Sequence, residues 1–122
     1  MTADTSMWYC PKCGFVDSFR KYFWRCPKCG GPLDIMYRPR WEPIEGRRGM
    51  VRYLRALPPI GAHVTLGEGG TPTIVRDVAG IKVWFKLEYL NPTGSFKDRG
   101  TSLAISLASE LGFERVVEDT SG

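Results

Sequence analysis

A lysine in the second half of the chain lies where an amine could do chemistry. The run that contains it is Asn91-Pro92-Thr93-Gly94-Ser95-Phe96-Lys97-Asp98-Arg99-Gly100. Pro92 and Gly94 predict a rigid turn ahead of the lysine. Ser95 and Asp98 fit an S-x-x-D capping box, so we expect a helix with Ser95 as its N-cap and Lys97 in its first turn. The helix macrodipole disfavours a cation there, which favours the neutral amine that Schiff-base chemistry needs.

A lone lysine at a helix start is usually a surface residue, but the whole ten-residue run indicates a functional role. It resembles the cofactor-lysine motif of the fold-type II pyridoxal-phosphate enzymes, and within them that of the threonine synthase family. The resemblance extends upstream through residues 85–90 and 67–72 and downstream to residues 119–122. In that family the lysine forms a Schiff base with pyridoxal phosphate. The resemblance therefore implies that Lys97 is both the catalytic residue and the cofactor ligand.

The same resemblance implies a reaction and further site residues. The reaction converts O-phospho-L-homoserine and water to L-threonine and phosphate, a carbon–oxygen lyase reaction in which the freed amine of Lys97 acts as general base. Thr120 and Ser121 are implied to bind the substrate carboxylate. Lys86 is a candidate for the substrate phosphate, with a surface role on a strand as an equal alternative. Related dehydratases, cysteine synthases and cysteate synthases share the lysine turn in a looser form.

Four cysteines form two near-identical pairs with the overall spacing C-x2-C-x12-C-x2-C. They are Cys10, Cys13, Cys26 and Cys29. Each pair lets two thiolates converge on one cation, and the glycine that follows lets the backbone turn its amides toward the sulfurs. Four thiolates complete the closed tetrahedral shell of a structural zinc site, with iron as the minor alternative. The spacing and the absence of a secretory signal favour metal-bound thiolates over two disulfides.

The residues around these pairs predict a zinc ribbon of about three short strands, of which residues 33–37 form one. Aromatic and basic residues alternate between the pairs, and a stacking platform for single-stranded nucleic acid that uses Arg20, Lys21 and Arg25 is one interpretation. We favour the other, in which so small a module needs its aromatic residues as a core. Several archaeal-type threonine synthases resemble this arrangement, with a zinc ribbon ahead of the enzyme body.

The rest of the chain predicts a linker and part of an α/β sheet. A short helix is expected near residues 50–57. We interpret the charged residues around it as a solvated face, and His63 as a neutral or surface residue. A strand with one apolar face begins at Ile81 after a turn at residues 77–80. The helix after Lys97 runs to about Leu111, and Gly112 is its C′ residue. Residues 115–118 complete a strand–turn–helix–strand unit.

The apolar stripe of that helix is expected to be Leu103, Leu107 and Leu111. We therefore predict three regions: a zinc ribbon in residues 1–37, a linker with a short helix in residues 38–63, and an incomplete α/β segment of a fold-type II N-terminal domain in residues 64–122.

Composition excludes several classes of protein. The 122 residues are 43% hydrophobic and 25% charged, as in a soluble globular protein, and no apolar run reaches membrane-spanning length. The cytoplasm is the expected compartment. The formal charge is +4 with neutral thiols, and four thiolates around Zn²⁺ contribute −4 + 2 = −2, which leaves about +2. So small a charge makes a nucleic-acid partner an unlikely expectation.

Two hypotheses follow. In the first, the chain is the N-terminal portion of a threonine synthase, and the 122-residue chain alone is expected to be inactive because a glycine-rich loop for the cofactor phosphate and a second domain are lacking. Self-association or a missing C-terminal polypeptide would then cover its unpaired sheet edge. In the second, it is a stand-alone zinc-ribbon protein that binds nucleic acid or protein and keeps the lysine motif as a relic.

Overall fold

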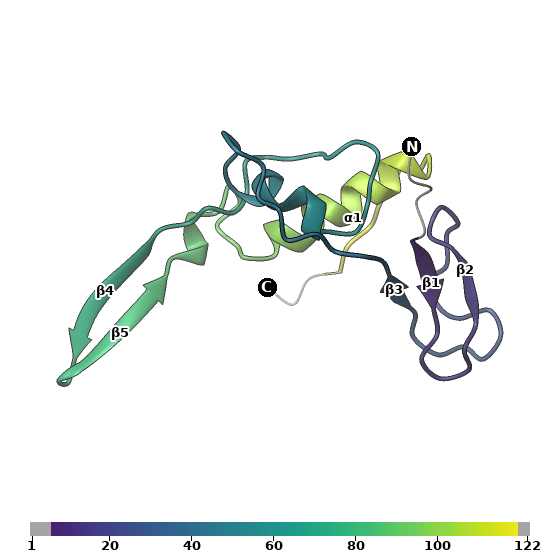
Figure 1. Cartoon of the computed structure of the whole chain (residues 1–122), viewed down its shortest axis with the longest axis horizontal. Helices are drawn as coiled ribbons and strands as arrows, with labels where there is room; N and C mark the ends of the chain where they lie inside the picture. Colours follow the sequence, from purple (N-terminus) through teal and green to yellow (C-terminus); the bar gives the residue numbers. More distant parts are fainter. Residues whose placement is uncertain (1–5, 120–122) are drawn as a thin grey trace.

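Three short strands form an antiparallel sheet beside the cysteines at one end of the chain (Figure 1). The computed structural model describes residues 6–119. The strands are β1 (Met7–Tyr9), β2 (Val16–Ser18) and β3 (Asp34–Met36), in the order β2-β1-β3. Trp8 of β1 lies opposite Asp17 on one side and Ile35 on the other. This sheet is compatible with the predicted zinc ribbon.

The core of this module is very small. Among the apolar side chains of the described residues, only Cys10, Phe19 and Cys26 are buried. Phe19 packs against Trp8 with ring centroids 5.1 Å apart, and Phe15 packs edge-on against Phe23 at 5.6 Å. Phe15, Phe19 and Phe23 thus contribute to the core as predicted, whereas Tyr22 and Trp24 are 60% and 71% exposed and do not.

The middle of the chain is an irregular segment wrapped on a short 3₁₀ helix, η1 (Met50–Ala56). The amides of Arg40 and Ile44 donate to the carbonyls of Arg55 and Arg52 at 2.8 and 2.7 Å, which holds the preceding segment against η1. The predicted short helix is confirmed in position. Leu57 is already extended, as the position before Pro58 requires.

A two-stranded hairpin projects from the opposite end of the molecule (Figure 1). It consists of β4 (Thr73–Val78) and β5 (Ile81–Lys86), joined by Ala79 and Gly80. Both turn residues have positive φ, 52° and 78°, and the Gly80 amide donates to Oδ1 of Asp77 at 2.9 Å. The strand expected at Ile81 is confirmed. The sequence analysis missed β4 and placed part of it in the turn.

After the hairpin come a short 3₁₀ helix, η2 (Glu88–Leu90), and the one α-helix of the described residues, α1 (Asp98–Glu110). The amide of Phe113 donates to the carbonyl of Ala108 at 3.0 Å, and that of Gly112 to Ser109 at 3.1 Å. With φ of 79° at Gly112, these bonds form a Schellman motif. The prediction of Gly112 as C′ residue is confirmed.

The buried face of α1 differs from the predicted leucine stripe. The most buried residues of the helix are Ser102 and Ser106, whereas Leu103 and Leu107 are only half-buried. Oγ of Ser106 accepts a hydrogen bond from the Val64 amide at 2.8 Å. Residues 63–68 therefore pack on α1 through polar contacts, which an apolar periodicity does not reveal.

The strand predicted at residues 115–118 is wrong. These residues are extended but unpaired, and Val116 and Val117 are 58% and 96% exposed. A strand exists only where a neighbour accepts its hydrogen bonds, and within residues 6–119 no strand lies beside this segment. The sheet of the second half of the chain is thus an antiparallel hairpin, in place of the expected strand–turn–helix–strand unit.

Much apolar surface is left in solvent. The chain exposes 9319 Å², whereas a compact monomer of 13.7 kDa exposes about 6,600 Å². Trp84 and Ile81 on the hairpin are 72% and 67% exposed. None of the helices formed by residues 6–119 is both long and apolar enough to cross a membrane.

The hairpin turn yields the first testable prediction. Ala79→Asn should stabilise the chain by roughly 0.5 kcal/mol, because asparagine tolerates positive φ and Asn-Gly is the preferred two-residue hairpin turn. Gly80→Ala should destabilise it by a similar amount or more. Thermal unfolding followed by circular dichroism measures both; equal midpoints for the two variants would contradict the turn geometry.

Candidate functional site

The four cysteines converge on one point. Their sulfur atoms all lie within 4.8 Å of one another, with Cys10 3.6 Å from Cys29 and Cys13 3.6 Å from Cys26. A disulfide needs about 2.05 Å, so the thiols are free. A tetrahedron with zinc–sulfur bonds of about 2.3 Å has sulfurs about 3.8 Å apart. The observed spacing is compatible with such a shell, and the four predicted ligands are brought together.

Backbone amides face the sulfurs, as the glycine positions predict. Burial raises the pKa of the Cys10 thiol, but the amides of Cys13 and Lys12 lower it more, to about 7. Gly14 and Gly30 both have positive φ, near 70°, and their amides donate back to the carbonyls of Cys10 and Cys26 at 2.9 Å. The amide of Phe15 lowers the pKa of the Cys13 thiol, but burial and the sulfurs of Cys29, Cys26 and Cys10 raise it more, to about 12. The four thiols therefore ionise unequally, and a bound cation would favour the thiolate form of all of them.

The turn that carries Lys97 is braced from within. The carboxylate of Asp98 accepts hydrogen bonds from the amide and hydroxyl of Thr93, the first at 2.9 Å. Gly94, with φ of 81°, donates its amide to the carbonyl of Asn91 at 2.8 Å. The side chain of Asp98 therefore closes the turn onto the start of α1.

The predicted capping box is wrong in detail. Helix α1 begins at Asp98, so Lys97 is its N-cap residue, with φ −60° and ψ −24°, and lies just ahead of the first turn. The hydroxyl of Ser95 accepts from the amide of Lys97 at 3.2 Å, which is a local turn. Asp98 cannot complete the box because its carboxylate is already engaged with Thr93.

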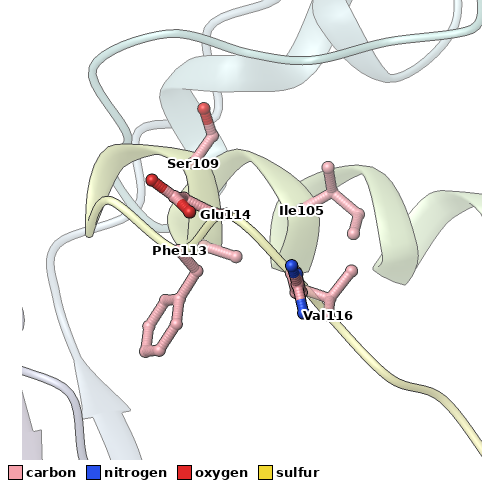
Figure 2. A pocket seen from close by; sticks show the side chains of 7 residues that line it. Ile105, Ser109, Phe113, Glu114 and Val116 are labelled. Atoms are coloured by element: carbon pink, nitrogen blue, oxygen red, sulfur yellow. The ribbon is translucent and has the colours of Figure 1, made fainter.

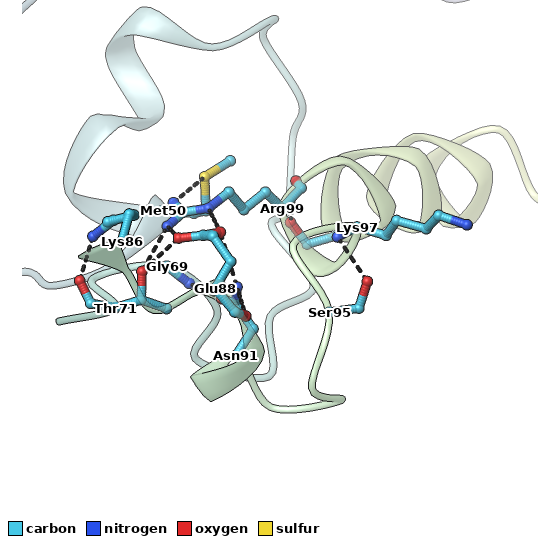
Figure 3. Close-up of polar contacts among 10 residues, drawn as sticks. Met50, Gly69, Thr71, Lys86, Glu88, Asn91, Ser95, Lys97 and Arg99 are labelled. Carbon is cyan, nitrogen blue, oxygen red and sulfur yellow. Dashed lines mark hydrogen bonds and ion pairs between the residues drawn. The ribbon is translucent and has the colours of Figure 1, made fainter. Parts of the chain in front are cut away.

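Figure 3 shows that the side chain of Lys97 points away from a polar cluster formed by Glu88, Arg99, Thr71 and Asn91. It is exposed, and within residues 6–119 its Nζ atom makes no hydrogen bond or ion pair. Lys86 lies on the other side of this view, where its ammonium donates to the carbonyl of Thr71. The structure does not bring the two lysines together. Thr120 and Ser121, the predicted carboxylate ligands, lie outside the described residues.

The polar cluster centres on an ion pair that the sequence analysis missed. Nε and Nη2 of Arg99 each donate to a carboxylate oxygen of Glu88 at 2.8 Å. Thr71 donates its hydroxyl to the same carboxylate at 2.5 Å, and the amide of Asn91 adds a further bond at 3.1 Å. Arg99, with help from Thr71, holds the pKa of Glu88 at about 2, and Glu88 raises that of Arg99. Three segments of the chain meet at this carboxylate (Figure 3).

A second carboxylate, Glu68, is almost fully buried at 2% exposure. It accepts from the hydroxyl of Thr65 at 2.7 Å and from the amide of Leu66 at 2.9 Å. Burial raises the pKa of Glu68, but hydrogen bonds from Thr65, from its own amide, from His63 and from Ser102 lower it to about 2. The histidine is not a surface residue: its side chain is 6% exposed, with Nε2 3.2 Å from Oε1 of Glu68.

The glycines beside Glu68 have a packing role. Gly69 has φ of 84°, and a Cβ there would lie 2.9 Å from Nη1 of Arg99 and from the amide of Met50. Its own amide donates to Oδ1 of Asn91 at 2.9 Å. Arg99 could move aside, but the backbone of Met50 could not, so this backbone contact and the positive φ explain a glycine at this position.

A shallow hollow lies elsewhere, between the second half of α1 and the chain that follows it (Figure 2). It is lined by Ile105, Ala108, Ser109, Phe113, Glu114, Arg115 and Val116. It sits at the end of α1 opposite to Lys97 and contains none of the predicted site residues.

The chain is similar in sequence to known proteins. Residues 64–122 match the family described as "Pyridoxal-phosphate dependent enzyme". Curated relatives include threonine synthases of Methanosarcina acetivorans (35% identical over 93% of this chain), Methanocaldococcus jannaschii (40% over 71%) and Synechocystis sp. (39% over 62%). The chain spans 31%, 25% and 22% of those proteins, respectively. No solved structure matches it significantly.

The sulfur geometry predicts that the chain takes up one Zn²⁺ ion. Cys29→Ala should abolish stoichiometric binding, because a closed shell needs all four thiolates. Metal analysis of the purified chain, with Co²⁺ absorbance as a second probe, measures this. Asp34→Asn, on the exposed strand β3, is the matched control and should bind normally. Full zinc content in Cys29→Ala would contradict the site.

The two depressed carboxyl pKa values predict acid sensitivity. A glutamate has a pKa of 4.5 when unperturbed, and Glu68 and Glu88 fall to about 2 in the folded chain. Their stabilisation is therefore complete above pH 4.5 and is lost as the pH falls toward 2. Urea unfolding at stepped pH should show this decline, and Glu88→Gln should reduce it.

Glu42→Gln serves as the control for that series. It removes an exposed ion pair with Arg55 at 3.3 Å, which contributes at most about 1 kcal/mol. If Glu42→Gln alters the loss of stability at low pH as much as Glu88→Gln does, the hydrogen bonds of Glu68 and Glu88 are not the cause of that loss.

Proposed function

We propose that this chain, whose residues 64–122 match the pyridoxal-phosphate dependent enzyme family, carries the cofactor-lysine segment of a threonine synthase. The proposed reaction converts O-phospho-L-homoserine and water to L-threonine and phosphate. Relatives that bear the name threonine synthase and match up to 93% of the chain support this choice over other enzymes of the family.

The observation that carries the proposal is the unengaged amine of Lys97. It stands at the end of a turn fixed by Asp98 and by the Glu88–Arg99 ion pair, and it is accessible to a small carbonyl compound. These features fit a lysine that holds pyridoxal phosphate. The bound cofactor would supply an electron sink for a carbanion at the substrate.

The roles of this chain's own residues follow from that assignment. The amine of Lys97 binds the cofactor covalently and, once released, accepts and returns protons at the substrate carbons. Thr120 and Ser121 are proposed to hold the substrate carboxylate. For Lys86, the contact with the carbonyl of Thr71 supports the surface-strand role, and a phosphate contact would require it to turn away.

Catalysis also needs water to be excluded from the cofactor. Lys97 is exposed, and so are the neighbouring Phe96 and Tyr89, at 64% and 66%. We propose that further polypeptide, either a second copy or the part of the relatives that this chain does not match, covers this surface. By itself the 122-residue chain is then inactive, and its free thiols suit a cytoplasmic location.

The alternative, a stand-alone ribbon that binds nucleic acid, has less support. Lys21 pairs with Asp17 at 2.9 Å and Arg20 pairs with Glu110, so two of the three cations it needs are engaged within the chain. Arg25 lies over the ring of Trp24, 3.4 Å from its centroid.

Borohydride trapping tests the proposal. The purified chain is incubated with pyridoxal phosphate and reduced, and the modified lysine is located by peptide mass spectrometry. Lys97 should be labelled several-fold more than Lys82, Lys86 or any other lysine. Before reduction, Lys97→Ala should lack the visible absorbance of the Schiff-base adduct. Lys86→Ala is the matched control and should keep it. Equal labelling of the exposed lysines would overturn the assignment.

A further inference from the structure

The loop between the two cysteine pairs contacts the far end of α1. Arg20 in this loop forms an ion pair with Glu110, the last residue of the helix. Two residues along the loop, Tyr22 packs edge-on against Phe113 with ring centroids 5.0 Å apart. Segments about 90 residues apart in the sequence therefore meet at two adjacent points.

Glu110 joins a third segment to this contact. Its second carboxylate oxygen accepts a hydrogen bond from the amide of Gly61 at 2.8 Å. Gly61 lies two residues before His63, which is buried against Glu68. One carboxylate at the end of α1 thus holds both the cysteine loop and the segment that packs along the helix.

The shape of the loop depends on both cysteine pairs. Cys13 precedes it and Cys26 follows it, so a metal ion bound by all four thiolates fixes its two ends. Inside the loop, the carbonyl of Lys21 accepts from the indole of Trp8 at 2.8 Å. Without a metal, no ion holds the four sulfur atoms together, and any thiols that ionise repel one another. The positions of Arg20 and Tyr22 are then less well fixed.

We propose that Glu110 is a positioning residue that couples metal binding at the four cysteines to the stability of helix α1. The metal fixes the loop, the loop holds Glu110 and Phe113, and these contacts hold the C-terminal end of the helix that starts after Lys97. The coupling is reciprocal, so the same contacts increase the affinity of the cysteines for the metal. This inference concerns metal and helix alone and stands whatever chemistry Lys97 performs.

Hydrogen–deuterium exchange of the α1 amides tests the coupling. In the zinc-loaded wild-type chain, the last two turns of α1 should exchange about fivefold more slowly than after chelation, the size expected for one ion pair plus one aromatic contact. In Glu110→Gln the zinc-loaded and chelated forms should differ by less than about twofold. An equal zinc effect in wild type and Glu110→Gln overturns the proposal, and so does no effect in wild type.

A competition titration with a chromophoric chelator measures the reciprocal effect, the affinity of the chain for Zn²⁺. This measurement can be made even if the chelated chain unfolds. Glu110→Gln and Arg20→Gln should each weaken Zn²⁺ binding about threefold to fivefold, and the double variant should be no weaker than either. Glu114→Gln, a glutamate at the same end of the helix (Figure 2), is the matched control and should bind as wild type does. Unchanged affinity in Glu110→Gln, or equal weakening in Glu114→Gln, contradicts the coupling.

Discussion

The ion pair between Glu88 and Arg99 is the interaction on which the lysine turn depends. It is bidentate, with both bonds at 2.8 Å, and it closes the segment from residue 88 to residue 99, near the end of which Lys97 lies. Thr71 and Asn91 share the same carboxylate, so the glycine-rich segment and the turn are tied to one point. Breaking the pair would leave a partly buried charge without its partner, which costs more than the pair contributes when intact.

Two sets of directional contacts, one around buried polar groups and one around the four cysteines, take the place of a large apolar core in this chain. The described residues bury only three apolar side chains but bury six polar ones, among them Glu68, Asn91 and Ser106. At the other end, four cysteines converge where a bound metal ion would do for the small sheet what a core does for a larger domain. Directional contacts fix the backbone of the lysine turn while they leave the amine of Lys97 unengaged, which is the arrangement that covalent chemistry with a cofactor requires.

Short-range features could be predicted from the sequence, whereas long-range pairings could not. The spacing of the cysteines predicted their convergence, and Gly112 predicted the end of α1, because each depends on a few neighbouring residues. The contacts of Glu88 with Arg99 and Thr71, and those of Glu110 with Arg20 and Gly61, depend on which distant segments meet. The capping box failed because Asp98 found Thr93, and the strand at 115–118 failed because no partner strand lies beside it. The domain boundaries and the roles of Lys97, Lys86, Thr120 and Ser121 stay predictions.

The most direct test of this account is amide hydrogen exchange by NMR across residues 69–101 in Arg99→Met, which keeps much of the length of the side chain but removes its charge. If the ion pair holds the turn, the amides of Gly69, Asn91 and Gly94 should lose protection by tenfold or more, roughly 1.4 kcal/mol, while those of β4 and β5 stay protected. Unchanged protection at Gly69 and Gly94 would mean that the turn is held by its local sequence, and the central role given to Glu88 and Arg99 would be wrong.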